Sequence, residues 1–274
     1  MSILVAEIGW NFIGNLSLAK KMILKAKKSG ADAVKFQIWD PKFLKKGDWD
    51  LDGRRKIYEK ASLNERKYKL LKNFAKKNSI RCFASVFNKE GINMLNKLKD
   101  DWVKIPSHEA YNLDLIELAF RNFKKVIISL GCLKKKELQK ILSFITKNGS
   151  YKKKAILLHC VSSYPLEPEN CNFEKFDYLK RKFDNIGYSG HMQGINDALF
   201  ALSKGASLIE KHFTINKNLP GRDNKFAILP NELAALSNYK KNLKKFGKKR
   251  GLGLLSCEKD IFKNYRGRWS KKIN

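Results

Sequence analysis

The sequence alternates between short β-rich runs and stretches with helical spacing, and this alternation limits the folds that the chain can adopt. The eight β-rich runs cover residues 3–8, 33–38, 80–85, 102–106, 125–130, 155–161, 186–189 and 207–212. Between them, apolar residues recur at i, i+3, i+4 and i+7, which is the pattern of an amphipathic helix. Eight β/α units in about 250 residues predict an α/β fold, a single-domain (β/α)8 TIM barrel that we expect over residues 1–250.

A doubly wound open sheet is the main alternative to the barrel. It rarely needs eight strands, and its phosphate fingerprint is missing because the chain has no GxGxxG and no Walker motif. The predicted helices carry apolar stripes at Ala19, Met22, Ile23 and Ala26, at Leu138, Ile141, Leu142 and Ile145, and at Leu236, Tyr239, Leu243 and Phe246. We expect Asn15 to open the first of these helices and Gly30 to close it.

The chain is strongly basic, with 57 Lys and Arg against 26 Asp and Glu and a formal net charge of +31. Such a charge is common in nucleic-acid-binding proteins. The lysines, however, are spread along the whole chain on the polar side of amphipathic patterns, and no stretch interleaves aromatic and basic residues as an RNA-binding sheet would. We therefore interpret the charge as a solvated surface that attracts an anionic substrate, and we expect no nucleic-acid partner.

Other features favour a cytoplasmic protein. No run approaches the roughly 18 apolar residues of a membrane span, so we expect no membrane partner. The segment "ILVAEIG" reads as a strand and lacks the basic region and cleavage site of a signal peptide. The five cysteines form no CxxC and no metal-ligand spacing, which is typical of reduced thiols.

Polar residues gather where the predicted strands end, although parallel strands buried on both faces are usually continuous runs of Val, Ile and Leu. Residues two apart in a strand share a face, so Lys35 and Gln37 point the same way. The same spacing pairs Ser189 with His191, Glu210 with His212, and Cys160 with Ser162 and Tyr164, while Glu7, Lys104 and Ser129 end three other strands.

Two lysines inside a barrel need partners, because desolvating an ammonium costs several kcal/mol unless it is paired. Lys35 and Lys104 can be balanced by internal carboxylates, for example Glu7 and Glu210, or by an anionic ligand. The two lysines and the serines at the strand ends together favour a site for phosphate and carboxylate oxygens.

The chain has only four histidines. His159 faces away from Cys160 within its predicted strand, and we interpret it as a core residue, whereas His108 follows the fourth strand. His191 and His212 end the seventh and eighth strands, which are neighbours in a barrel. Two imidazoles on adjacent strand ends can share one divalent cation and leave open positions for substrate and water.

Seven motifs arrive in order at the predicted strand ends: "VAEIGWNFIGN", "GADAVKFQ", "VKIPS", "VIISLG", "LLHCVSSYP", "IGYSGH" and "IEKHFTINKNLPGRD". Together they closely resemble the sialic acid synthase family, which comprises the N-acetylneuraminate synthases and their legionaminic and pseudaminic acid relatives. The resemblance covers roughly residues 3–245. It implies a transferase that condenses phosphoenolpyruvate with an N-acetylmannosamine-type sugar to give a nine-carbon 2-keto acid and phosphate, for surface polysaccharide biosynthesis.

The resemblance also implies roles for individual residues. His191 and His212 would hold a divalent metal ion, Mn²⁺ first and Mg²⁺ or Co²⁺ as alternatives, and Glu7 would handle a proton near the reacting centre. The other implied positions surround phosphoenolpyruvate (Lys35, Lys104, Ser107, Ser129, Ser162 and Ser189) or line the sugar side (Gln37, Tyr164 and Asp223). It further implies a homodimer.

This sequence departs from the family pattern at several points. Phe12 replaces a histidine, Gly190 an aspartate, and Arg222 and Asn224 stand in the usual "PGPDHK" segment. Family members generally carry a C-terminal antifreeze-like domain that caps the partner's barrel and supplies an arginine to the sugar. We expect that domain to be absent here, with 251–274 as a tail at the position of the interdomain linker. Arg222 is a candidate substitute for that arginine. A changed acceptor sugar, a separately encoded cap and a degenerate enzyme are all compatible with these departures.

Two further interpretations remain open at this point. One keeps the barrel but changes the reaction, to an aldolase or a synthase of another 3-deoxy sugar acid. The other is a non-catalytic barrel that binds anions or nucleic acid, which would show steeply salt-dependent binding.

Overall fold

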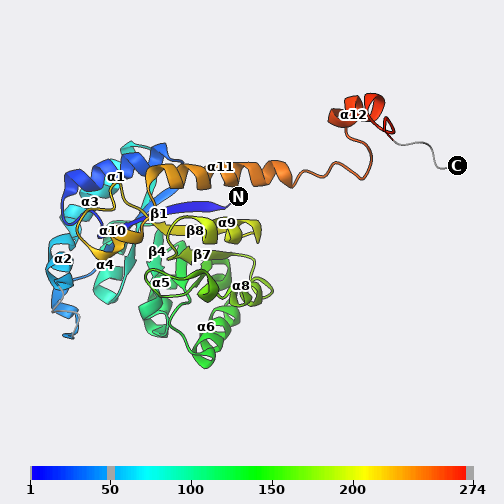
Figure 1. The fold of residues 1–274 in the computed structure, drawn as a ribbon. Coiled ribbons are helices and arrows are strands. Elements are labelled where there is room, and N and C mark those ends of the chain that lie inside the picture. The colour runs from blue at the N-terminus through cyan, green and yellow to red at the C-terminus, as the bar shows by residue number, and fades with distance from the viewer. Residues whose placement is uncertain (1, 48–52, 270–274) are drawn as a thin grey trace. The chain divides into compact units, whose positions relative to one another are not determined.

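A computed structural model describes residues 2–47 and 53–269, and within them eight parallel strands close into a barrel in sequence order (Figure 1). The strands are Ile3–Gly9 (β1), Ala33–Ile38 (β2), Arg81–Val86 (β3), Trp102–Ile105 (β4), Lys125–Ser129 (β5), Ala155–Cys160 (β6), Ile186–Gly190 (β7) and Leu208–His212 (β8). Each coincides with a predicted β-rich run to within a residue or so at either end. The predicted TIM barrel is therefore confirmed.

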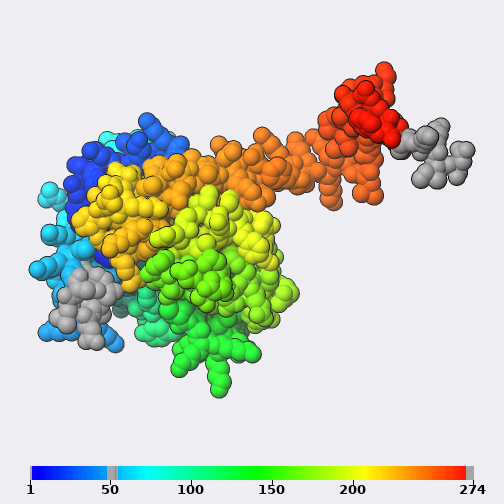
Figure 2. Space-filling view, in the orientation of Figure 1, coloured from blue at the N-terminus to red at the C-terminus, as the bar shows by residue number. Residues whose placement is uncertain are grey.

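Helices cover the outside of the strands, as an α/β barrel requires (Figure 1). The α-helices are Leu16–Lys28 (α1), Arg54–Ala61 (α2), Glu65–Lys77 (α3), Lys89–Lys97 (α4), Leu113–Asn122 (α5), Lys135–Lys147 (α6), Gly149–Lys154 (α7), Phe173–Lys180 (α8), Asn196–Ser203 (α9), Arg222–Phe226 (α10), Pro230–Phe246 (α11) and Lys259–Asn264 (α12). Short 3₁₀ turns are Pro41–Phe43 (η1), Ser107–Glu109 (η3), Pro168–Asn170 (η4) and Ser256–Glu258 (η5). In the space-filling view, the yellow segment with α10 lies beside the blue N-terminal segment, which is consistent with the pairing of β1 with β8 (Figure 2).

The chain divides into two compact units, Met1–Lys240 and Lys241–Asn274. The first unit contains the barrel. The second contains the end of α11 together with η5 and α12, and several of its apolar side chains, such as Leu252 and Trp269, are exposed. Among the described residues, no helix has the length and apolar character that crossing a bilayer requires.

Local sequence signals correctly predict where α1 begins and ends, but they do not predict how much of α11 is buried. Asn15 caps α1 by accepting a hydrogen bond from the Leu18 backbone, and Gly30 follows its end with φ of +88°, as predicted. The stripe predicted for α11 weakens along the helix: Leu236 is buried, Tyr239 and Leu243 are half-buried, and Phe246 is wrongly predicted because it is 70% exposed. Spacing indicates an amphipathic helix but not how far a core extends beside it, and the unit that contains the barrel ends before the last turns of α11.

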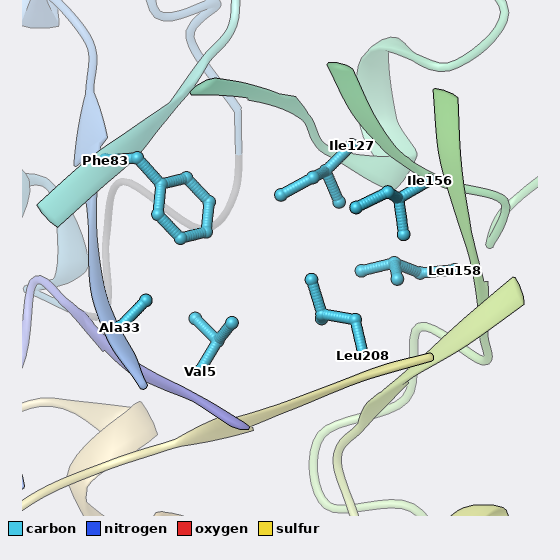
Figure 3. Close-up of a cluster of buried hydrophobic side chains, with 7 residues drawn as sticks. All are labelled: Val5, Ala33, Phe83, Ile127, Ile156, Leu158 and Leu208. Carbon is cyan, nitrogen blue, oxygen red and sulfur yellow. The ribbon is translucent and has the colours of Figure 1, made fainter. Parts of the chain in front are cut away.

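The barrel interior changes from apolar to polar along the strands. A cluster of apolar side chains fills one layer, where they point toward one another (Figure 3): Val5, Ala33, Phe83, Ile127, Ile156, Leu158 and Leu208. Residues two apart share a face, so the next inward layer follows on the same strands. It consists of Glu7, Lys35, Ser85, Ser129, Cys160 and Glu210, all of them buried. The apolar layer thus forms the floor beneath a polar site at the carboxyl ends of the strands.

Candidate active site

Two carboxylates neutralise the two lysines that point into the barrel. Lys35 forms an ion pair with Glu7 and lies 3.7 Å from the carboxylate of Glu210, while Lys104 forms an ion pair with Glu210. Lys35 also donates a hydrogen bond to the hydroxyl of Ser85, at 2.7 Å. All four charged side chains are at most 5% exposed. The internal carboxylates considered from the sequence are therefore present, and they line the same space as the lysines.

The surroundings of Glu7 and Glu210 shift their acidities in opposite directions. Burial raises the pKa of Glu7 to about 7, against the attraction of Lys35 and with added repulsion from Glu210. Burial also opposes ionisation of Glu210, but the charges of Lys104 and Lys35 outweigh it and lower the pKa of Glu210. Glu7 is therefore the carboxyl group that can exchange a proton near neutral pH.

A β-bulge shapes the position of Glu7. The pairing of β1 with β2 shifts between Glu7 and Gly9, where φ is +53°. A side chain at Gly9 would place its Cβ 2.8 Å from Glu7 Oε1 and 3.2 Å from Gln37 Nε2. Only glycine leaves room for the hydrogen bond of 2.8 Å that Gln37 donates to Glu7.

Serine hydroxyls complete a small inner cavity of about 60 Å³. Ser189 donates to Glu210 at 3.0 Å, and Ser107 accepts from the Gly131 backbone at 3.2 Å. The buried hydroxyl of Ser129 has no hydrogen-bond partner among the described residues. Of the predicted site residues, the inner cavity is lined by Glu7, Lys35, Gln37, Lys104, Ser107, Ser129, Tyr164, Ser189, His191 and His212.

Two predicted site residues lie next to this cavity rather than in it. Ser162 lines a neighbouring, more open cavity with Cys132 and Lys175, and its hydroxyl is 3.8 Å from the Cys160 sulfur. Asp223 lines an outer cavity, described below.

His191 and His212 face each other across the ends of β7 and β8, with ring centroids 5.6 Å apart. Burial lowers the pKa of His191 to about 3 and holds the pKa of His212 well below its ordinary value, so both rings are neutral. His191 Nδ1 donates to the carbonyl of Val161 at 3.0 Å, which leaves Nε2 with its lone pair. A neutral imidazole oriented by a backbone carbonyl is the usual form of a metal-ligating histidine.

The histidine pair therefore fits a divalent cation, with the remaining ligands coming from outside the protein. Within residues 2–47 and 53–269, no group of three or more His, Cys, Asp and Glu side chains is placed to hold a metal ion. His212 Nδ1 lies 3.5 Å from an Asp223 oxygen. A site with two protein ligands leaves several coordination positions for water and substrate.

A larger outer cavity of about 590 Å³ opens beyond the histidines and shares Gln37, Tyr164 and His212 with the inner one. Its walls are largely aromatic: Trp10 stacks on Tyr58 with centroids 4.6 Å apart, and Trp39 meets Tyr58 edge to face. The Trp10 indole donates to Asp223, and burial raises the pKa of Asp223 to about 6.

Arg222 lies over the Tyr164 ring, 5.0 Å from its centroid, and also lines the outer cavity. Stacked aromatic faces with a few polar groups are typical of sites for sugars and other small ligands.

Sequence reasoning missed some of these residues and interpreted others correctly. Ser85 is a polar residue at the end of its predicted strand, as Ser129 is. It is nevertheless absent from the predicted site residues. Trp10 and Tyr58 lie outside the strands, where no periodic signal was available. His159, predicted as a core residue, is fully buried among aromatic rings and bonds through Nε2 to the Cys171 carbonyl, at 2.8 Å.

Comparison with known proteins gives consistent results. The model of the NeuB family matches residues 22–250. The chain is 34% identical to the N,N'-diacetyllegionaminic acid synthase of Campylobacter jejuni, over 96% of this chain and 81% of that protein. It is 32% identical to the N-acetylneuraminate-9-phosphate synthase of Drosophila melanogaster, over 88% and 68%. Its fold matches the N-acetylneuraminic acid synthetase of Leptospira borgpetersenii, solved with citrate, with a TM-score of 0.85, 32% identity, and coverage of 99% and 93%.

Proposed function

This chain belongs to the NeuB family, and we propose that it condenses phosphoenolpyruvate with an N-acetylmannosamine-type sugar. The products are a nine-carbon 2-keto sugar acid and inorganic phosphate, in a transferase reaction of surface polysaccharide biosynthesis. The observation that carries the proposal is the junction of two unlike cavities. A small one, lined by lysines and serines, shares walls with a larger aromatic one.

The inner cavity suits the oxygens of phosphoenolpyruvate. Lys35 and Lys104 supply positive charge, and the hydroxyl of Ser129 is available to donate. We assign Ser107, Ser162 and Ser189 to the same role. A volume of about 60 Å³ admits a phosphate-sized group, so the rest of the molecule would extend toward the outer cavity. Donors fixed on strands stabilise developing charge without reorganising, which is the main source of rate enhancement in such sites.

The outer cavity suits the acceptor sugar. We assign Gln37, Tyr164 and Asp223 to its polar contacts, because all three line this cavity. The stacked rings of Trp10 and Tyr58 offer an apolar wall for the ring face or the N-acyl group. Arg222 adds a cation to the lining of this cavity, over Tyr164.

Proton transfer is assigned to Glu7. Attack of the enol carbon on the sugar aldehyde leaves positive charge at C2, which water captures before phosphate departs. A carboxylate with a pKa of about 7 can accept a proton from that water and pass it to the departing phosphate. Lys35 and Gln37 hold the two Glu7 oxygens in place for this step.

His191 and His212 would hold the divalent ion, which we propose to be Mn²⁺, with Mg²⁺ and Co²⁺ as alternatives. Bound there, the ion would supply Lewis-acid polarisation of the sugar aldehyde. The neutral state of both rings and the carbonyl that orients His191 support the assignment.

The proposal is tested by phosphate release from phosphoenolpyruvate in the presence of Mn²⁺, with N-acetylmannosamine and a panel of related 2-acetamido and diacetamido sugars. We expect release that depends on one class of sugar and that a chelator abolishes. As a control, the variant Lys97→Met removes the charge of an exposed lysine and should leave the rate unchanged. Absence of release with every sugar, from protein shown to bind Mn²⁺, would contradict the proposal.

A Schiff-base aldolase is the second candidate, because burial lowers the pKa of Lys104 and so favours an amine nucleophile. It predicts a covalent adduct with a keto acid that borohydride traps at Lys104 or Lys35. The synthase reaction predicts no adduct, and mass spectrometry of the reduced protein distinguishes the two. The homodimer and the cytoplasmic location remain predictions, the first of which light scattering on the purified chain would test.

A further inference from the structure

A third buried ion pair lies just outside the barrel wall, behind the two histidines. Lys211 precedes His212 on β8 but points to the opposite face, where its ammonium contacts both oxygens of Asp197 at 3.0 Å. The two side chains are 3% and 0% exposed. Asp197 comes from the first turn of α9, so the pair joins a helix to the strand that ends in His212.

The same ammonium also reaches the loop that carries His191. Lys211 Nζ donates to the carbonyl of Met192 at 2.7 Å, and Met192 directly follows His191. One cation therefore ties the residue after the first histidine to the residue before the second. Strand pairing adds to this link, because Gly190, directly before His191, lies opposite Lys211 in the β7–β8 ladder.

The carboxylate of Asp197 is held in turn from two further sides. The Tyr188 hydroxyl donates to Oδ2 at 3.1 Å, and the Ala198 backbone donates to Oδ1 at 2.9 Å. The carboxylate also occupies the space beside Gly190, where an added Cβ would lie 2.2 Å from Oδ2 and 2.6 Å from the Tyr188 ring. Gly190 is thus required by the close approach of Asp197.

We propose that Asp197 is a positioning residue for His191 and His212, acting through Lys211 on the backbone at both histidines. The inference rests on the proposed function only in taking the two histidines as metal ligands. Replacing a residue that holds a metal ligand in place commonly weakens metal binding about 10- to 100-fold. Asp197 touches neither histidine in the contacts described above, so its effect has to pass through Lys211.

The first test is Mn²⁺ binding to the metal-free full-length chain, followed by the electron paramagnetic resonance of free Mn²⁺. We expect Asp197→Asn to weaken binding about 10- to 100-fold, because an amide cannot hold the ammonium as a carboxylate does. Gly190→Ala should weaken binding similarly by displacing the carboxylate.

Matched controls separate this role from general destabilisation. Lys204 and Asp177 form an equally close pair, at 2.9 and 2.8 Å, that is partly exposed and remote from the histidines, so Asp177→Asn should bind Mn²⁺ as wild type does. Tyr188→Phe keeps the ring and removes only one hydrogen bond, so it serves if Asp197→Asn does not fold. Wild-type affinity in Asp197→Asn, or in both Tyr188→Phe and Gly190→Ala, would overturn the proposal.

A metal-independent measurement distinguishes failure of this inference from failure of the proposed metal site. Long-range ¹H–¹⁵N spectra of the imidazoles can be assigned because the chain has only four histidines. We expect wild-type His191 to show one tautomer, protonated at Nδ1, and Asp197→Asn to show an averaged pattern. If wild type binds no Mn²⁺, the metal assignment fails, and these spectra still decide the role of Asp197. An unchanged His191 pattern in Asp197→Asn would overturn it.

Discussion

The buried pair of Lys104 and Glu210 allows charge balance to be separated from ligand binding by experiment. Their side chains are 5% and 4% exposed. Without Lys104, Glu210 would keep the hydrogen bond from Ser189 and the charge of Lys35, 3.7 Å away. Removing one partner of a buried ion pair costs about 3–5 kcal/mol. We expect Lys104→Met to lower the free energy of unfolding by about 3 kcal/mol, the lower end, because Lys35 remains.

Replacing both partners should restore stability without restoring function. Lys104→Met with Glu210→Gln leaves no uncompensated charge, and we expect a free energy of unfolding within about 1 kcal/mol of wild type. Turnover should stay low in both variants, because each lacks one of the two lysines that we assign to phosphoenolpyruvate. We expect kcat/KM for phosphoenolpyruvate to fall about 10²- to 10³-fold.

Urea unfolding followed by circular dichroism measures the first quantity, and phosphate release measures the second. The exposed pair of Lys97 and Glu65, with side chains 70% and 41% exposed, provides the matched control. Its double replacement should change stability by less than about 1 kcal/mol and leave turnover intact. A Lys104→Met/Glu210→Gln variant that regained both stability and turnover would refute the reasoning, because Lys104 would then serve only to neutralise Glu210.

Three further predictions concern single residues. Glu7→Gln should slow turnover about 10²- to 10⁴-fold and remove the limb near pH 7 from the kcat profile, and a variant that keeps this limb would argue against Glu7 as the proton carrier. Burial lowers the pKa of His159 to about 4, so its stabilising contribution is complete above the unfolded pKa of about 6.5 and is lost as pH falls toward 4. Between pH 7 and 5, wild type should therefore lose about 2 kcal/mol more than His159→Gln in urea unfolding, and equal losses would contradict this. Trp10→Ala should raise KM for the sugar about 10-fold and leave KM for phosphoenolpyruvate unchanged. Equal effects on both KM values would show that the aromatic wall does not bind the sugar specifically.

The sequence predicts the barrel and much of the inner cavity because both depend on short-range spacing. The period of two along each strand places Lys35 beside Gln37 and Glu210 beside His212 on one face. It does not predict which inward residues meet across the barrel, since the pairing of Lys104 with Glu210 depends on how eight strands close.

Contacts made by loops and helices were harder to anticipate. Trp10 and Tyr58 are far apart in the chain, and neither carries a periodic signal. The contact of Asp197 with Lys211 joins a helix to a strand that the sequence treats as separate elements. Lys211 also shows that the alternation of faces along a strand does not predict which side chains are buried. A charged residue between two inward side chains points out of the barrel, yet it is as buried as they are.

The two cavities differ in which parts of the chain build them. Strand ends supply the lysines and carboxylates of the inner cavity, whereas Trp10, Tyr58 and Arg222 of the outer cavity lie in the loops and helices that follow strands. Connections tolerate insertion and replacement far better than barrel strands do. Divergence in the sugar accepted can therefore proceed by exchanging loops while the chemistry beneath is inherited unchanged. A laboratory redesign of acceptor choice has the same freedom, provided that it leaves the strand ends alone.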